Sequence, residues 1–264
     1  MPSHMSAIGF EVETEQQFQE YASLALARGE AVKTGSGVYV KWAPGLGIEL
    51  WAQGDNDKTF VGLNPHFTGG GMMQVRLTER MTRPNDSSLD GAFYGWAAPG
   101  EEGAAEGLFP LVFDCPDFDT HRQLALPALA DVQLAAFAHS IDVYEDDDHF
   151  ASSQDSDASF APESFIPAGL FPSEDDSVQT PKSYAVFQGH VLAASLIKNP
   201  ATEREFHWAL VKTLGGDIDV LADPQLVDSE IHVGNVVSGY FWLSGRLIED
   251  APKTKKSWFG LKRQ

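Results

Sequence analysis

The alternation of apolar and polar positions predicts a β-rich chain, most clearly between residues 184 and 247. Three segments in this stretch have strand character, and they read YAVFQGHVLAASLI, FHWALVKTLGGDIDVLA and NVVSGYFWLSGRL. Runs of this kind, joined by short turns, are typical of antiparallel sheets and small barrels. The C-terminal third therefore defines the fold class better than any other part of the chain.

The middle segment predicts a hairpin whose two-residue turn is Gly215-Gly216, because glycine readily supplies the positive φ values of such turns. A turn at these residues places Lys212 opposite Asp219 as a cross-strand ion pair. One face of the hairpin is almost wholly apolar and is predicted to face the core. Its members are Ala209, Val211, Ile218, Val220 and Ala222.

The N-terminal part predicts a β-α-β-β-β order. Residues 8–13 alternate like a strand, and Thr14 with Gln17 matches a capping box at the start of a helix from Glu15 to Arg28. Gly29 is placed to end that helix. Three short strands are expected to follow, at residues 31–34, 38–42 and 47–52.

The segment from residue 60 to 118 is β-like but irregular. Strands are predicted at residues 72–81, 91–97 and 108–113, and turns at residues 64–66 and 85–88. His66 is then a loop residue. The triple glycine at residues 69–71 does not match a phosphate loop, because no Lys-Ser/Thr pair follows and the next element is a strand.

A strand is predicted at residues 132–143, although the Ala-rich first half of DVQLAAFAHSIDVY would also suit a helix. The following connection is strongly acidic and contains no Lys or Arg between residues 142 and 180. A short helix at residues 146–152 is expected inside it. Phe160, Phe165 and Phe171 are expected to anchor the connection as ordered structure.

The last strand supplies candidate ligand-binding residues. Gly239 and Gly245 lie on one face, where another backbone or a bend can approach, while Tyr240 and Trp242 project from the other face. Arg246 follows at the end of this apolar strand. Its guanidinium could clamp an acidic group of a ligand, or it could pair with a nearby Asp or Glu of the chain.

The order of elements in residues 8–53, ending in the strand GIELWAQ, resembles one half-module of the vicinal-oxygen-chelate (glyoxalase-like) fold. In that family a Glu on the last strand of a module can bind a divalent metal, and the resemblance places Glu49 at this position. The family's metal-binding His on the first strand has no counterpart in AIGFEVE, and no second module follows. The resemblance implies a metal-dependent enzyme that uses Glu49.

A second resemblance covers about residues 131–247. The stretches AFAHSIDVY, SFIPAGLF, YAVFQGHVL, TLGGDIDVL and GNVVSGYFWLSGRL are similar to an uncharacterised bacterial protein family. This resemblance implies a single folded unit and a bacterial source. It transfers no catalytic residue.

Composition and charge argue against several classes of function. The net charge of −20 would repel a phosphate backbone, which argues against nucleic-acid binding even by an OB-like barrel. No apolar run is long enough to span a bilayer and no signal peptide is evident, so we expect a cytoplasmic protein without membrane association. Cys115 is the single cysteine, so no intrachain disulfide can form, and its apolar and acidic neighbours would raise its thiol pKa.

Two other groups of residues give weaker indications of a functional site. His190, His207 and His232 could converge on a metal ion if they shared one wall of a barrel, but unrelated structural roles are the simpler interpretation. The C-terminal KTKKSWFGLKR combines charge with aromatic anchors and could dock on an acidic surface of this chain or of a partner. The residues expected to carry that interaction are Lys255, Lys256, Trp258 and Phe259.

We therefore predict an α+β, mostly antiparallel β protein, in which an N-terminal domain containing the β-α-β-β-β unit precedes a C-terminal OB-like small β-barrel. The predicted divisions are an expression scar over 1–5, the N-terminal domain over 6–125, a strand and acidic connection over 126–182, the barrel over 183–249 and a basic tail over 250–264.

For function we expect a non-catalytic binding or interaction protein without a cofactor, whose partner is a protein or a small molecule. The residue patterns leave homo-oligomer formation open. The alternative is the metal-dependent enzyme of glyoxalase-like type that uses Glu49. No set of nucleophile, base and acid emerges from the sequence to favour catalysis.

Overall fold

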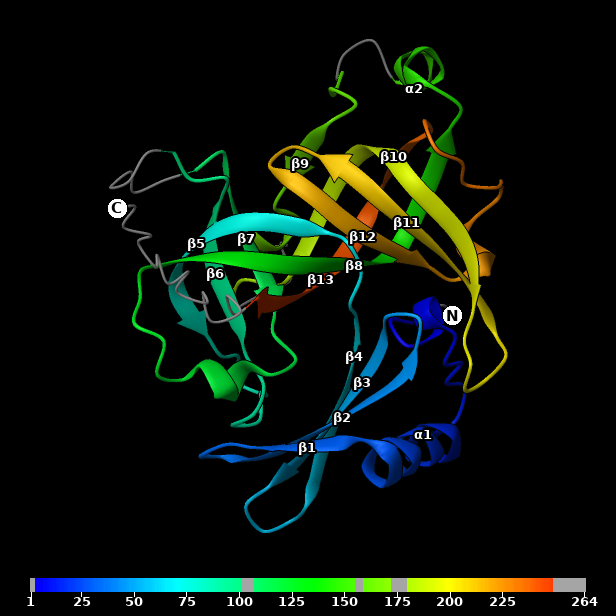
Figure 1. Cartoon of the computed structure of the whole chain (residues 1–264). Coiled ribbons are helices and arrows are strands. Elements are labelled where there is room, and N and C mark those ends of the chain that lie inside the picture. The colour runs from blue at the N-terminus through cyan, green and yellow to red at the C-terminus, as the bar shows by residue number, and fades with distance from the viewer. Residues whose placement is uncertain (1–2, 101–106, 155–158, 172–179, 249–264) are drawn as a thin grey trace, which may run out of the picture.

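The computed structural model describes residues 3–100, 107–154, 159–171 and 180–248. It is mostly β structure, arranged as a four-stranded sheet with helix α1 (Glu15–Arg28) below a nine-stranded sheet (Figure 1). Helix α2 (Asp147–Ser153) projects at the far end of the larger sheet. No helix in the described ranges is long and apolar enough to cross a membrane.

The four-stranded sheet is an antiparallel meander that follows α1. Its strands are β1 (Glu30–Lys33), β2 (Gly37–Gly45), β3 (Ile48–Asp55) and β4 (Phe60–Phe67). The predicted helix is confirmed from end to end, with the Thr14–Gln17 capping box in place. The three predicted strands are confirmed as β1, β2 and β3.

Two local predictions in this part are wrong. Residues 8–13 do not form a strand; a 3₁₀-helix at Ser6–Ile8 ends at Gly9, whose φ of 79° turns the chain toward α1. Residues 64–66 are not a turn but part of β4, where His66 is fully buried. Pro65 is tolerated there because β4 is an edge strand and can lack one ladder donor.

The larger sheet contains every remaining strand of the described ranges. These are β5 (Met72–Met81), β6 (Ala92–Ala97), β7 (Phe109–Asp114), β8 (Ala128–Tyr144), β9 (Ser164–Ile166), β10 (Tyr184–Lys198), β11 (Glu205–Thr213), β12 (Gly216–Ala222) and β13 (Val236–Ile248). The strand predicted at residues 132–143 is confirmed within β8, so the helical alternative is wrong. The short helix predicted after it is confirmed as α2.

The pairings of the larger sheet close into two rings that share β8 and β13. One ring runs β10–β11–β12–β8–β13 and returns to β10, and the other runs β5–β6–β7–β13–β8 and returns to β5. Only the β12–β8 and β13–β7 pairings are parallel. The long strands β8 and β13 therefore hold the whole sheet together.

The β11–β12 hairpin exists, but its turn lies one residue earlier than predicted. Thr213 pairs with Gly216, so Leu214 and Gly215 form the turn, and Lys212 faces Asp217. The predicted ion pair between Lys212 and Asp219 is therefore wrong. A shift of the turn by one residue keeps the same side chains on the same face, so the predicted core face is confirmed. Its members are all buried: Ala209, Val211, Ile218, Val220 and Ala222.

Two apolar cores lie on opposite sides of the strands shared by the rings. The first is formed by the inward side chains of both rings. The second lies between the outer faces of β8, β11, β12 and β13 and the N-terminal layer, where Phe137, Leu221 and Trp242 meet Phe10 and Ile48. Met5, in the predicted expression scar, is buried in this second core. The four-stranded sheet is thus docked on one face of the larger sheet.

The glycines of β13 explain how closely the rings pack. A Cβ at Gly239 would lie 2.3 Å from the carbonyl oxygen of Ser140 and 2.6 Å from the ring of Phe241. A Cβ at Gly245 would lie 2.5 Å from the ring of Phe113. The predicted close approach at these two glycines is confirmed.

Candidate functional site

A chain of polar side chains crosses the interface between the two sheets. His66 on β4 contacts the Ser244 hydroxyl through Nδ1 at 2.8 Å and the Gln133 amide oxygen through Nε2 at 2.9 Å. Gln133 donates its amide N–H to Asp219 at 2.9 Å. Asp219 is a carboxylate and can only accept, so the Gln133 amide N–H points to Asp219 and the Gln133 amide oxygen points to His66. His66 Nε2 therefore carries the proton and donates to that oxygen, and His66 Nδ1 accepts from the Ser244 hydroxyl.

Burial keeps His66 neutral. The side chain has no exposed surface, and this desolvation lowers the pKa of His66 to about 4. The carboxylate of Glu49 opposes the shift, and the guanidinium of Arg246 adds to it. His66 and Ser244 are therefore buried structural partners that join the two sheets.

Asp219 is the anchor of this polar chain. Its carboxylate accepts hydrogen bonds from the backbone N–H groups of Gly70 at 3.1 Å and Gly71 at 2.7 Å, and from Trp208 Nε1 at 2.8 Å. A Cβ at Gly69 or Gly71 would lie within 2.5 Å of Asp219. The triple glycine is therefore an anion-binding loop whose anion is a carboxylate of the same chain.

Glu49, the predicted metal ligand, lies in a cluster of donors. Its carboxylate pairs with Lys41 Nζ at 2.5 Å and accepts from Thr68 Oγ1 at 2.9 Å and Trp51 Nε1 at 2.8 Å. Arg246 Nη1 lies 3.8 Å away. Both carboxylate oxygens thus have partners within the chain.

Arg246, the predicted ligand clamp, is paired inside the protein. Its Nη2 and Nε lie 3.2 and 3.3 Å from Asp117 Oδ2, and its guanidinium carbon lies 5.0 Å from the centre of the Trp51 ring. Burial alone would raise the pKa of Asp117. The close contact with His121 and the charge of Arg246 outweigh that effect and hold the pKa of Asp117 well below its usual range. Arg246 thus joins the N-terminal layer to the loop after β7.

That loop brings Cys115, Asp117 and His121 together. One ligand-type atom of each lies within 4.8 Å of the others, and no other such group of three occurs in the described ranges. Burial is the main cause that raises the pKa of the Cys115 thiol far above its usual value, and Asp117 adds to it. This cluster was not predicted from the sequence, although the spacing Cys-x-Asp-x₃-His is visible in CPDFDTH.

A second feature is an aromatic patch on the outer face of β8, β13 and β10, defined by His4, His139, Tyr184, Tyr240 and Trp242. Tyr184 and Tyr240 stack with ring centroids 5.3 Å apart, and His139 lies within 5.5 Å of both. His4 covers Trp242. The Trp242 indole donates to Asp114 at 2.6 Å. Tyr240 and Trp242, both predicted to bind a ligand, therefore share one surface, and Arg246 lies apart from it.

The imidazoles of the aromatic patch are neutral at pH 7. Burial is the main cause that lowers the pKa of His4 to about 4, and the neighbouring His139 adds to it. Burial also lowers the pKa of His139. The two Nε2 atoms lie 2.9 Å apart, a distance that requires one ring to donate and the other to accept.

The remaining histidines considered for a metal site do not meet. His190 on β10 contacts Asp147 of α2 at 2.7 Å and Glu163 at 2.9 Å, and it ties the acidic connection to the larger sheet. His207 and His232 border a separate cavity of about 240 Å³. The predicted tail residues Lys255, Lys256, Trp258 and Phe259 lie outside the described residues.

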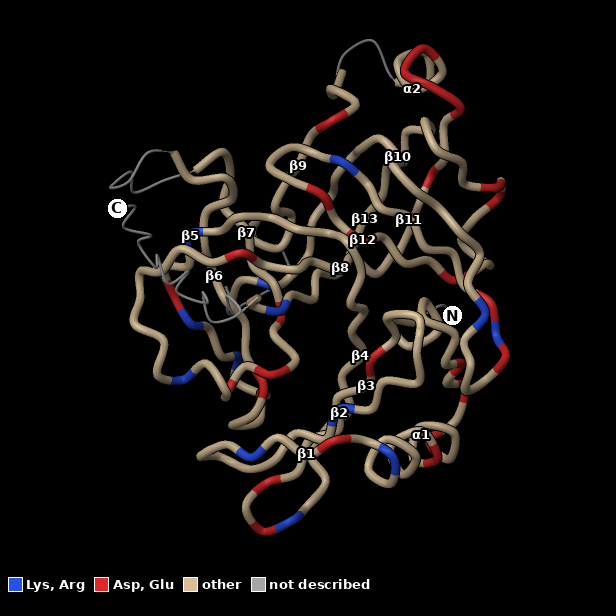
Figure 2. The backbone as a smooth tube through the Cα atoms, in the orientation of Figure 1, with Lys and Arg blue, Asp and Glu red and all other residues tan. Residues whose placement is uncertain are grey.

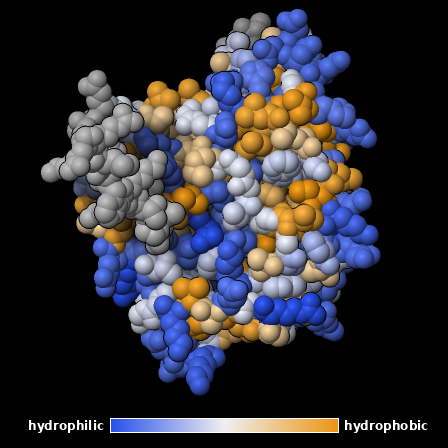
Figure 3. Space-filling view, viewed as in Figure 1, coloured by the Kyte–Doolittle hydropathy of each residue, from blue (hydrophilic) through white to orange (hydrophobic). Residues whose placement is uncertain are grey.

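The surface has two further features, an acidic area and an apolar area. Acidic residues gather at α2, at the top of the view in Figure 2. Apolar surface lies over β10 and β11 in Figure 3. Leu192 and Leu196 on β10 and Leu214 in the turn between β11 and β12 are exposed. Nothing in the structure shows what would cover this apolar area.

Comparison of the chain with protein-family models, with curated proteins and with solved structures finds no match.

Proposed function

We propose that this chain is a non-catalytic binding protein that recognises a partner protein through the aromatic patch. The stacked pair of Tyr184 and Tyr240 is the observation that carries the proposal. These rings lie on the outer face of β10 and β13, at the edge of the area that the N-terminal layer covers, where Tyr184 packs against the second core. Tyrosine and tryptophan combine apolar area with a polar tip, and they are enriched in protein interfaces.

An OB-like architecture for the first ring supports a binding role. In chain order, β8 is the first strand of this ring. If β8 is instead counted as the last strand, the order in which the strands pair agrees with that of an OB fold, and so does the one parallel pair of the ring, β12–β8. In OB folds the outer sheet face binds ligands. Here the N-terminal layer covers part of that face through Trp208 and Leu221, so we place the partner on the neighbouring outer face, which carries the aromatic patch.

The chemistry of the patch favours a cationic partner segment. The two imidazoles carry no charge at pH 7, and tyrosine faces attract guanidinium groups. Asp142 is exposed on β8 two residues beyond Ser140, which pairs with Tyr240. An arginine stacked on the tyrosines could therefore pair with Asp142, within a protein of net charge −20.

A tetra-arginine peptide tests this proposal by isothermal titration calorimetry, first at low salt and then at about 0.5 M salt. The peptide is expected to bind the wild-type chain about tenfold more tightly than the Tyr184→Ala/Tyr240→Ala double variant. A Leu196→Ala/Leu214→Ala double variant, changed in the separate apolar area, serves as the matched control. Equal affinity of all three proteins would mean that the peptide senses only the net charge, and the proposal would fail.

A further inference from the structure

We propose that Cys115, Asp117 and His121 form a binding site for a divalent transition-metal ion of the zinc type. This inference is independent of the aromatic patch and of Glu49. It rests on the geometry of the loop after β7, on one buried imidazole nitrogen that lacks a hydrogen-bond partner in the described residues and on the chemistry of the three donors.

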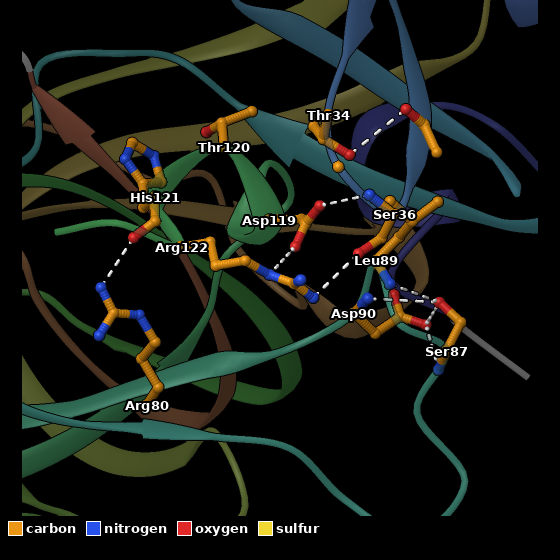
Figure 4. A network of polar contacts seen from close by, with 12 residues as sticks. Thr34, Ser36, Arg80, Ser87, Leu89, Asp90, Asp119, Thr120, His121 and Arg122 are labelled. Atoms are coloured by element: carbon orange, nitrogen blue, oxygen red, sulfur yellow. Dashed lines mark hydrogen bonds and ion pairs between the residues drawn. The ribbon is translucent and has the colours of Figure 1, made fainter. Parts of the chain in front are cut away.

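The loop holds its three side chains in fixed positions. Cys115 N–H donates to the Gly91 carbonyl at 3.0 Å, and Phe118 N–H donates to the Cys115 carbonyl at 3.2 Å. The 3₁₀-helix at Phe118–His121 then orients the imidazole. Arg80 Nη2 donates to the His121 carbonyl at 2.7 Å, as Figure 4 shows. Preorganised ligands of this kind reduce the ordering that an ion would otherwise impose.

The separations fit a tetrahedral ion. Cys115 Sγ lies 3.2 Å and His121 Nε2 lies 3.5 Å from the same oxygen, Asp117 Oδ1. All three atoms lie within 4.8 Å of one another. Bonds of about 2.0 to 2.3 Å at tetrahedral angles place ligand atoms about 3.3 to 3.6 Å apart.

His121 Nε2 gives the independent observation. This atom is buried and has no hydrogen-bond partner among the described residues, whereas buried polar atoms ordinarily have one. The nearest acceptor, Asp117 Oδ1, is 3.5 Å away and already takes the Cys115 S–H. An ion bound between the three side chains would use the lone pair of this nitrogen.

The surroundings suit such an ion. Arg246 holds the second oxygen of Asp117, so Oδ1 is left for the metal, as outer-shell partners do in metal sites. His121 also borders a cavity of about 430 Å³ together with Gln74, Leu129 and Asp131, which offers an entry path. Asp119 is turned toward Ser36 and Arg122 and lies outside the cluster (Figure 4).

The donor set selects the kind of ion. A thiolate and an imidazole are ligands of zinc and related ions, whereas magnesium and calcium prefer oxygen donors. On binding, the Cys115 thiol loses its proton to solvent, and sulfur forms the bond to the metal. The thiolate and the Asp117 carboxylate then balance the two charges of the ion. The fourth position is left for water or a small ligand.

Cobalt titration tests the site, because a bond between Co²⁺ and a thiolate produces a near-ultraviolet charge-transfer band. The full chain, stripped with a chelator, is titrated with Co²⁺ alone and then with competing Zn²⁺. One equivalent of Co²⁺ is expected to produce the band, and Zn²⁺ should abolish it. A wild-type chain that shows no such band at saturating Co²⁺ overturns the proposal, whatever the variants do.

Variants separate the three ligands. His121→Gln and Asp117→Asn are each expected to weaken Co²⁺ binding at least about tenfold, and Cys115→Ser should remove the band. His232→Gln, changed at an exposed histidine, should bind Co²⁺ like the wild type. Circular dichroism verifies that each variant is folded. A band that persists unchanged in folded His121→Gln and Asp117→Asn would show that Cys115 binds the ion without these two residues, and this too would overturn the proposal.

Discussion

His4 lies flat on Trp242, with ring centroids 4.2 Å apart and planes inclined by only 7°. Its Nε2 also bonds His139 on β8, so one residue near the start of the chain links two strands of the larger sheet. The stacking protects the apolar face of the indole from water.

Replacing His4 with alanine should therefore cost stability even though the residue lies outside every helix and strand. We expect His4→Ala to lower the free energy of unfolding by about 1 kcal/mol, through the lost ring contact and the lost hydrogen bond to His139. Urea denaturation at pH 7 measures it. His232→Ala, at an exposed histidine, should change stability by less than about 0.5 kcal/mol. Equal stability of wild type and His4→Ala would show that the stacking is not formed in solution.

Asp219 should be the most sensitive carboxylate of β12. Asp219→Ala removes the acceptor of four donors, namely Gly70, Gly71, Gln133 and Trp208, and leaves the buried donors of Gly71 and Gln133 without these hydrogen bonds. We expect a loss of about 3 kcal/mol or more in urea denaturation. Asp217→Ala, two residues away on the same strand, provides the control and should cost less than about 1 kcal/mol. Similar losses for both variants would contradict the role of the glycine loop.

The contrast between these two aspartates shows where sequence reasoning succeeds and where it ends. The hairpin, its core face, helix α1 and strand β5 depend on neighbours within a few residues, and they were predictable. The hydrogen-bond partners of Asp219 could not be predicted in this way. Gly71 and Gln133 lie 148 and 86 residues away in sequence, so a local rule paired Asp219 with Lys212 instead.

The same reasoning explains the other misses. Pro65 interrupts the local strand signal of β4, and only the finished sheet shows that this strand lies at an edge. Arg246 was recognised as an unusual charge, but its partner Asp117 lies 129 positions earlier. The Cys115, Asp117 and His121 triplet was present in one heptapeptide. Its geometry depends on a 3₁₀ turn that composition does not reveal.

Acid should destabilise the interface between the two sheets through His66. The pKa of His66 is about 4 in the folded protein, below its ordinary 6.5, so between these values the unfolded chain binds the proton more readily. The stability from neutral His66 is complete above pH 6.5 and is lost as pH falls toward 4, by roughly 3 kcal/mol. Glu49, Arg246 and Asp117 are the charged groups that act on it.

Urea denaturation at several pH values between 7 and 4 measures this loss. His4 and His139 also have lowered pKa values and act in the same direction, so His66→Gln should flatten the pH profile only in part. His232→Gln should leave the slope unchanged. A His66→Gln profile parallel to that of the wild type would mean that His66 takes up its proton without cost in the folded state.

The central claim is that a cationic partner docks on the stacked pair of Tyr184 and Tyr240. The chain has six tyrosines, and selective ring labelling makes each of them an NMR probe. Addition of the tetra-arginine peptide should shift the ring signals of Tyr184 and Tyr240 and leave that of the buried Tyr39 in place. Shifts confined to Tyr94 and Tyr144, with Tyr184 and Tyr240 unmoved at saturation, would contradict the proposed binding surface.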